Sequence, residues 1–185
     1  MLALRTTLGL LLAITAASRI HAADASDFKP FASKGGRFTI SFPGKPDMST
    51  STIKTPIGDM ELHVFRASRG GKESYTLTYN DYPPDSLKGA DAERILDAAR
   101  DGGVGTMHSK VTKETKIAKS DKTLPSRDLE IDIQGTTAYA RLLLAGNRLY
   151  VIMAYPDGSS GSAARAKQFF DSFKLANEKP ADGSR

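Results

Sequence analysis

The amino-acid sequence predicts an α+β fold in which a mostly antiparallel sheet of about seven to eight strands is covered by two main helices. Short segments that alternate apolar with polar residues follow one another in runs, and residues typical of tight turns separate them. Two segments with helical periodicity follow the fourth and the eighth of these strands. Strands grouped in runs are typical of antiparallel sheets. The sequence contains no cysteine, so its core rather than disulfides must stabilise the fold.

The first 22 residues have the three parts of a secretory signal peptide. Arg5 gives a basic start, residues 8–17 an apolar centre, and residues 20–22 a small-residue ending after which cleavage is expected. The apolar run is about half of the roughly 20 residues that a membrane-spanning helix needs, and Arg19 interrupts its far side. We therefore expect an exported protein, periplasmic or extracellular, without stable membrane insertion after cleavage.

The rest of the chain is predicted to form one domain. Residues 23–36 are polar and are predicted to be a flexible lead-in, residues 37–175 the domain, and residues 176–185 a loose C-terminal tail. A domain of about 160 residues can bury roughly 70% of the surface that its unfolded chain exposes. One hydrophobic core is therefore enough.

The charge of the chain argues against a nucleic-acid partner. The net charge is +5, and it falls to +3 when Arg5 and Arg19 leave with the signal peptide. Nucleic-acid-binding domains gather Lys and Arg on one face as a footprint for phosphates. Here Asp and Glu are interspersed with the basic residues throughout, so we expect no nucleic-acid partner.

The first half of the domain is predicted to be an antiparallel meander of four strands. Three of them alternate apolar with polar residues, as strands with one buried face do. They are residues 37–42 (RFTISF), 60–67 (MELHVFRA) and 74–82 (SYTLTYNDY), and residues 50–55 form a short polar strand between the first two. Pro43-Gly44 and Pro83-Pro84 end the first and the last of the four.

An amphipathic helix follows the meander. It starts near Ala90, carries its apolar stripe on Ala92, Ile95, Leu96 and Ala99, and is expected to close at residues 102–103, Gly-Gly.

Four more strands and a second helix complete the domain. The strands are residues 111–118, 127–133, 136–145 and 148–155. Gly135 and the pair Gly146-Asn147 are the expected hairpin turns, and the last hairpin is apolar on both faces, as in a central pair covered on both sides. Ser160 is the expected cap of the second helix. Its apolar stripe, which should lie across the sheet, is Ala163, Ala166, Phe170 and Phe173.

Several short segments together resemble a known superfamily. They are RFTISFPGKP near the start, TLTYNDYPPD before the first helix, AARDGGVG after it, the hairpin ARLLLAGNRLYVIMA and the closing FFDSFKL. This series resembles exported bacterial domains of the PsbP-like superfamily, named for an extrinsic protein of the photosynthetic oxygen-evolving complex. The resemblance covers residues 37–175. It implies a central antiparallel sheet covered by helices and a non-catalytic role as adaptor or assembly factor, and it supplies no catalytic residues.

The residues that most often carry chemistry do not form a catalytic or metal-binding pattern. Lys45 in the glycine-containing loop is followed by Pro46 rather than Ser or Thr, so the loop is no phosphate-binding loop. His63 and His108 stand in different elements, and residues 158–162, GSSGS, lack the pattern of a serine nucleophile. We therefore expect no enzyme, no metal and no cofactor.

A group of acidic residues around the first helix also fits no calcium-binding loop. The group is Asp81, Asp85, Asp91, Asp97 and Asp101. Most are expected on a solvated face of the helix, and Asp91 in the first turn, where its charge complements the helix dipole.

The best candidate for a binding site is the bend TYNDYPPD together with a basic residue on a later strand. Tyr79, Asp81, Tyr82 and Arg141 are the candidate binding residues, because tyrosines beside an acid and a guanidinium can line a shallow recognition surface. A structural role remains open for each of them.

In that structural alternative, each candidate residue contributes to stability rather than to recognition. Tyr79 belongs to the core, Tyr82 packs against the two prolines, and Arg141 pairs with Glu130 or Asp132 across neighbouring strands.

The sequence thus leads to two functional hypotheses. The first is an exported, non-catalytic binding or adaptor domain of the bacterial cell envelope, whose partner is a protein or another envelope component. The alternative is a small-molecule or ion-binding protein with a pocket between helix and sheet, suggested by the tyrosine-rich strand and the nearby carboxylates.

Overall fold

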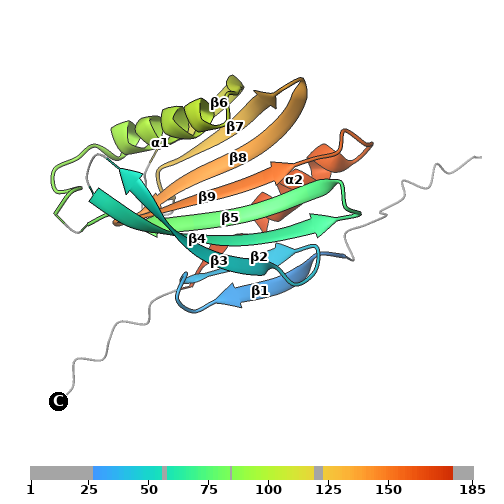
Figure 1. Cartoon of the computed structure of the whole chain (residues 1–185), viewed down its shortest axis with the longest axis horizontal. Coiled ribbons are helices and arrows are strands. Elements are labelled where there is room, and N and C mark those ends of the chain that lie inside the picture. The colour runs from blue at the N-terminus through green and yellow to red at the C-terminus, as the bar shows by residue number, and fades with distance from the viewer. Residues whose placement is uncertain (1–26, 56–57, 84, 119–122, 177–185) are drawn as a thin grey trace, which may run out of the picture.

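A computed structural model describes residues 27–55, 58–83, 85–118 and 123–176. These residues form a seven-stranded sheet, a small three-stranded sheet and two helices, so the predicted α+β fold is confirmed (Figure 1). The predicted signal peptide, residues 1–22, and nearly all of the predicted tail, residues 177–185, lie outside the described part of the chain.

The large sheet is antiparallel throughout, in the order β3-β4-β5-β9-β8-β7-β6. Its strands, in chain order, are β3 (Asp47–Thr55), β4 (Gly58–Arg69), β5 (Glu73–Asp81), β6 (Lys110–Ile117), β7 (Ser126–Ile133), β8 (Thr136–Ala145) and β9 (Arg148–Tyr155). Two predicted hairpin turns are confirmed. Gln134 and Gly135 join β7 to β8 with φ angles of 52° and 82°, and Gly146 begins the turn between β8 and β9 with a φ of 64°.

The small sheet consists of β1 (Lys29–Ser33), β2 (Phe38–Phe42) and β10 (Lys174–Leu175), in the order β1-β2-β10. The predicted meander required the strand at residues 38–42 to join the large sheet. It pairs instead with β1 and β10 in the small sheet. β1 also lies within residues 23–36, which were expected to be a flexible lead-in. The physical reason is Phe31, whose ring packs 5.6 Å from that of Phe65 and 6.0 Å from that of Phe42, measured between centroids.

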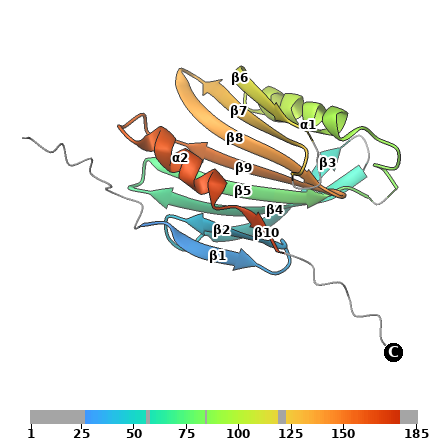
Figure 2. The same cartoon turned by 180° about the vertical axis from the view of Figure 1, so that it is seen from behind.

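The two helices cover opposite faces of the large sheet. α1 (Ala92–Thr106) lies over β7 and β8 in Figure 1, and α2 (Ser162–Asp171) lies behind β9 together with the small sheet, as the reverse view in Figure 2 shows. We call these two sides of the sheet the α1 face and the α2 face.

Both helices differ from the prediction at one end. α1 does not close at Gly102-Gly103 but continues to Thr106, and the N–H of Met107 donates to the carbonyl of Gly103. α2 is preceded by Gly161 at a φ of 84°, with no side-chain cap, so the prediction of Ser160 as the cap was wrong. Ser159 and Ser160 instead accept hydrogen bonds from the Arg165 side chain, at 3.0 and 3.5 Å.

Two hydrophobic clusters lie on the two faces. The cluster on the α2 face is mostly aromatic, because β2, β4, β5, β9 and α2 each turn aromatic side chains inward; its largest members are Phe38, Phe42, Phe65, Tyr75, Tyr79, Tyr150 and Phe169. The cluster on the α1 face is aliphatic and consists of Leu96, Leu129, Ile131, Ala140, Leu142, Leu144 and Leu149. The apolar character of both faces of the last hairpin follows from this two-sided covering.

Candidate functional site

The four candidate residues do not form one surface. Tyr79 and Asp81 alternate with Asn80 on β5 and lie on the α2 face, where the register places Asp81 opposite Arg148. Arg141 lies on the same face but two strands away, on β8. Tyr82 follows the end of β5 and packs against the cluster on the α1 face. Tyr82 and Arg141, expected to act together, are therefore separated by the sheet.

Tyr79 and Asp81 belong to a connection between the two sheets. The Arg148 guanidinium donates to both carboxylate oxygens of Asp81, at 2.7 and 2.6 Å, and to the carbonyl of Gly35, at 2.8 Å. Its central carbon lies 4.3 Å from the centroid of the Tyr79 ring. This hydrogen bonding lowers the pKa of Asp81, whereas burial raises the pKa of the Tyr79 hydroxyl. Tyr79 is buried, so it occupies the core position that was the alternative to a binding role.

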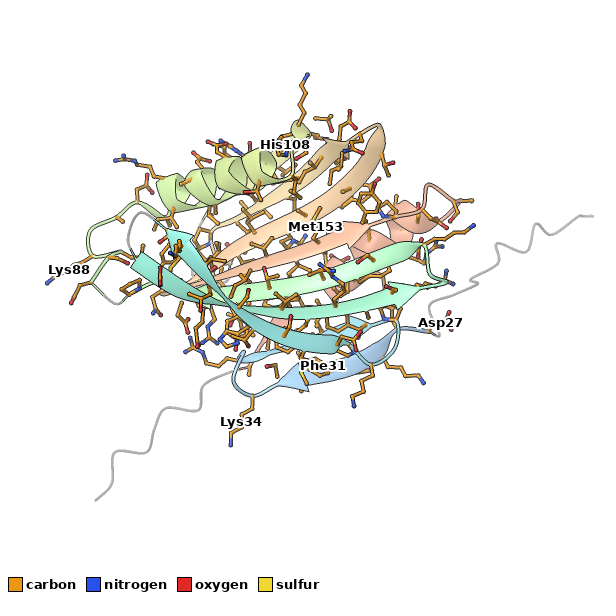
Figure 3. The ribbon with its side chains drawn as sticks, viewed as in Figure 1. Asp27, Phe31, Lys34, Lys88, His108 and Met153 are labelled. Carbon is orange, nitrogen blue, oxygen red and sulfur yellow. The ribbon has the colours of Figure 1, made fainter. Side chains whose placement is uncertain are left out.

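His63 stacks on the same tyrosine. The two ring centroids are 4.4 Å apart with an angle of 20° between the planes. His63 is half-buried, because the α2 face beside it is covered by the small sheet. His108 is exposed after the end of α1 (Figure 3). The described residues contain no group of three or more side chains suited to a metal ion.

Arg141 is held by a partner that the sequence did not indicate. Its guanidinium donates to both oxygens of Asp128, each at 2.7 Å, and lies 5.6 Å from the centroid of the Phe170 ring. The expected pairing with Glu130 or Asp132 was wrong, because the register places Asp128 directly opposite Arg141. The pair lines an open groove of about 280 Å³ between α2 and strands β6 to β8.

The end of the sheet near Tyr82 carries a second hollow, of about 310 Å³. The backbone of Tyr82 is fixed there, because its N–H donates to the carbonyl of Asn147 and its carbonyl accepts from the Asn147 side chain, at 2.8 and 2.9 Å. Half-burial raises the pKa of the Tyr82 hydroxyl. The lining is Asp59, Met60, Glu61, His63, Asp81, Tyr82, Pro83 and Asn147. We call this hollow the Tyr82 pocket.

A larger opening lies between α1 and the strands β3, β4, β5 and β9, and we call it the α1 cleft. Its volume is about 710 Å³. Most of its lining is apolar or small: Ile53, Lys54, Thr55, Met60, Asn80, Tyr82, Ala98, Ala99, Gly102, Gly103, Thr106, Leu149 and Val151. The α1 cleft and the Tyr82 pocket share Met60 and Tyr82, so they are neighbours.

Gly102 and Gly103 are unusual members of this lining, since both lie inside a helix. A glycine in a helix interior costs about 1 kcal/mol relative to alanine, and close packing against another element is the usual compensation. A Cβ atom built on either glycine would meet no atom within 4 Å. Within the described chain, no close neighbour therefore requires them.

The buried charged side chains among the described residues are paired with side chains of opposite charge. Glu73 and Arg165, both buried, form a bidentate pair on the α2 face, and the Tyr75 hydroxyl donates to Glu73 at 2.9 Å. Burial, with this bond, raises the pKa of Tyr75. On the α1 face, the fully buried Arg127 contacts a group of acids, Glu93, Asp97 and Glu114. These paired groups therefore stabilise the fold.

The sequence reasoning missed these pairs, although one signal was present. Arg127 has the same phase as Leu129 and Ile131 on β7, so alternation alone places it on the covered face. Glu93 and Asp97 are four residues apart and therefore lie on one side of α1. An arginine in a buried phase, together with two acids on one helix face, predicts a buried ion pair.

The comparisons with known proteins concern the fold. The solution structure of cyanobacterial PsbP (CyanoP) from Synechocystis sp. PCC 6803 superposes with a TM-score of 0.57 and 9% sequence identity, covering 83% of this chain and 95% of that one. This chain has a PsbP-like fold. No family model and no curated protein sequence matches it. At 9% identity the PsbP-like likeness transfers the arrangement of sheets and helices, and no functional residue.

Neither helix in the described ranges is long and apolar enough to cross a membrane.

Proposed function

We propose that the chain is an exported, non-catalytic binding domain that acts as an adaptor for a protein or another component of the cell envelope. The single observation that carries this proposal is the Tyr82 pocket, an open hollow at the end of the sheet whose walls combine a half-buried tyrosine with carboxylates. The PsbP-like fold supports the proposal, because the sequence resemblance to the PsbP-like superfamily implies a non-catalytic role. The paired state of the buried charges adds further support.

The chemistry of the pocket indicates the partner. Asp59 and Glu61 are exposed on its rim, whereas the charge of Asp81 is matched by Arg148. Tyr82 and Met60 add an apolar floor. A partner segment with a basic side chain beside an apolar one complements this surface. Arg141, on the far side of the sheet, is not part of it.

The test is crosslinking in cells followed by recovery of the tagged chain, exported by its own signal. We expect one dominant partner in near-stoichiometric amount with the wild type, and a loss of that partner in Tyr82→Ala and in Glu61→Lys. Arg141→Gln is the matched control and should retain the partner. Recovery of no partner by a folded, exported chain, or equal loss in the control, would contradict the proposal.

The same experiment tests export. The intact mass of the recovered chain should correspond to a mature protein that starts at Ala23. A protein that retains residues 1–22 would contradict the predicted signal cleavage.

A second candidate function is the binding of a small molecule between helix and sheet. The observation that favours it is the size and apolar character of the α1 cleft.

A further inference from the structure

The two edges of the large sheet differ in how well they are protected against further strands. β3 and β6 are its edge strands. An edge strand presents unpaired N–H and C=O groups that another strand can bind, and proteins usually block such an edge with lysines, prolines or a β-bulge. The β6 edge has two of these devices. Its register shifts at a bulge between Val111 and Lys113, and it carries three lysines, Lys110, Lys113 and Lys116.

The β3 edge has neither a bulge nor a proline. β3 pairs with β4 without a register shift over all nine residues, from Asp47 to Thr55. Its first six residues are exposed, including the apolar side chain of Met48, which is 63% exposed. Within the described ranges no strand pairs with the outer side of β3. In an antiparallel strand every second residue directs both its N–H and its C=O outward, so this edge is open to a further strand.

The charges of β3 indicate which strand fits it. Asp47 and Lys54, near opposite ends, are its charged residues, and the residues between them are uncharged. Antiparallel pairing with a second β3 about Ser51 places Asp47 of each copy opposite Thr55 and next to Lys54 of the other copy. An in-register parallel pair brings like charges together instead. β3 is thus complementary to an antiparallel copy of itself.

The ends of the strand agree with this register. In the sequence, Pro46 and Pro56 flank β3, each five positions from Ser51. Proline has no N–H to donate to a neighbouring strand, so the two prolines limit pairing symmetrically on both sides of Ser51. The same register places Thr50 of one copy opposite Thr52 of the other, and cross-strand threonine pairs stabilise antiparallel sheets.

We propose that the β3 edge is a self-association surface, through which two copies of the domain pair antiparallel about a two-fold axis at Ser51. The two large sheets then join into one, and no β3 edge stays open. The interface is narrow, because each copy contributes one strand, so we expect a weak and reversible dimer. The proposal goes beyond the adaptor role and does not depend on it.

Sedimentation equilibrium of the mature chain, residues 23–185, tests self-association. We expect the average mass to rise from that of a monomer toward that of a dimer between about 10 μM and 1 mM. Over the same range, hydrogen exchange of the β3 amides should slow, because pairing covers the outward N–H groups. A chain that stays monomeric at about 1 mM overturns the proposal. A dimer whose β3 amides exchange as fast as those of the monomer does so too.

Ser51→Lys tests the location of the axis. The substitution places two lysines opposite each other, and like charges in that position destabilise a strand pair. Ser51 is exposed, so the Tm of the monomer should change little. We expect the dimer affinity to fall about tenfold or more. The matched control is Thr115→Lys, at an exposed position of the β6 edge, which should dimerise as the wild type does. Equal loss in both variants, or no loss in Ser51→Lys, would refute the location.

Asp47→Lys and Lys54→Asp test whether the occupant is a second copy of the chain. Each variant alone brings like charges together at both ends of the strand pair, so each should dimerise more weakly than the wild type. An equimolar mixture of the two variants restores opposite charges at both ends and should form mixed dimers, detected by a fluorescent label on one variant. A mixture that associates no better than either variant alone contradicts the antiparallel register.

Discussion

Replacement of Arg165 by methionine should destabilise the domain, because Arg165 is a buried charged residue of α2 and pairs with the buried Glu73. Arg165 is 9% exposed and Glu73 is 2% exposed, so Arg165→Met leaves a carboxylate buried without its guanidinium. Removal of one member of a buried pair typically costs 3–5 kcal/mol. Here we expect about 3 kcal/mol, the lower end, because Tyr75 still donates to Glu73 and Arg69 lies 3.8 Å from it.

A double variant of Glu73 and Arg165 separates two free-energy costs: the loss of the ion pair and the burial of an unpaired charge. In Glu73→Leu/Arg165→Met neither charge of this buried pair remains, and the expected cost falls to about 1 kcal/mol, the loss of the acceptor for the buried Tyr75 hydroxyl. Lys167→Met is the control on the same helix. It breaks only the exposed pair with Asp171 and should cost about 0.5 kcal/mol or less.

Urea unfolding at pH 7, followed by circular dichroism, measures all four proteins. For a domain of this size, a loss of 3 kcal/mol corresponds to a drop in Tm of roughly 6–12 °C. The reasoning would be refuted if Arg165→Met lost less than about 1 kcal/mol, or if the double variant were less stable than Arg165→Met.

Three further predictions concern other elements. Asp91→Ala removes the side chain that accepts from the Glu93 N–H at 3.0 Å, so the free energy of unfolding in urea should fall by about 1 kcal/mol; an unchanged value would show that α1 does not need this cap. Asp81 has a lowered pKa in the folded state because of Arg148, so its ionised form stabilises the fold above the unfolded pKa near 3.9. The stability advantage of wild type over Asp81→Asn should therefore be present at pH 7 and shrink below about pH 4, whereas an advantage that does not vary with pH would contradict this linkage. A chain that begins at Arg37 lacks β1 and should melt at a clearly lower temperature than the chain from Ala23, because the aromatic cluster loses the cover of Phe31; equal melting would restore residues 23–36 as a dispensable lead-in.

Local signals in the sequence were sufficient for the strands and turns of the large sheet. Gly135 and Gly146 were correctly placed in hairpins, because two-residue turns require φ angles that glycine adopts freely. Each helix was recognised from its period, but not its end. Gly102 and Gly103 read as a stop signal, whereas the backbone passes through them in helical conformation. A helix ends where its last turn loses packing and hydrogen bonds, which short-range composition does not fully determine.

The candidate site was harder to predict because it depends on which strand lies beside which. Arg141 was expected to pair with Glu130 or Asp132, and only the register shows that Asp128 is the residue opposite. Tyr82 and Arg141 are 59 positions apart, and no local pattern shows on which side of the sheet each lies. The α1 cleft was equally hard to predict, since Asn80 and Gly103 line the same opening only when α1 packs over the sheet.

The pairing of β2 with β10 determines when the domain can finish folding. The last described strand supplies the neighbour of one of the first, the Phe173 ring stacks 6.1 Å from that of Phe38, and the N–H of Ala176 donates to the carbonyl of Arg37. Contacts between residues so far apart in sequence form slowly, because closing a long loop costs chain entropy before the contacts can offset it. A chain held by its leading segment in a translocation channel could not complete the small sheet before its final residues emerged. For the export proposed above, the same topology would delay closure of the aromatic cluster until the last strand has left the channel.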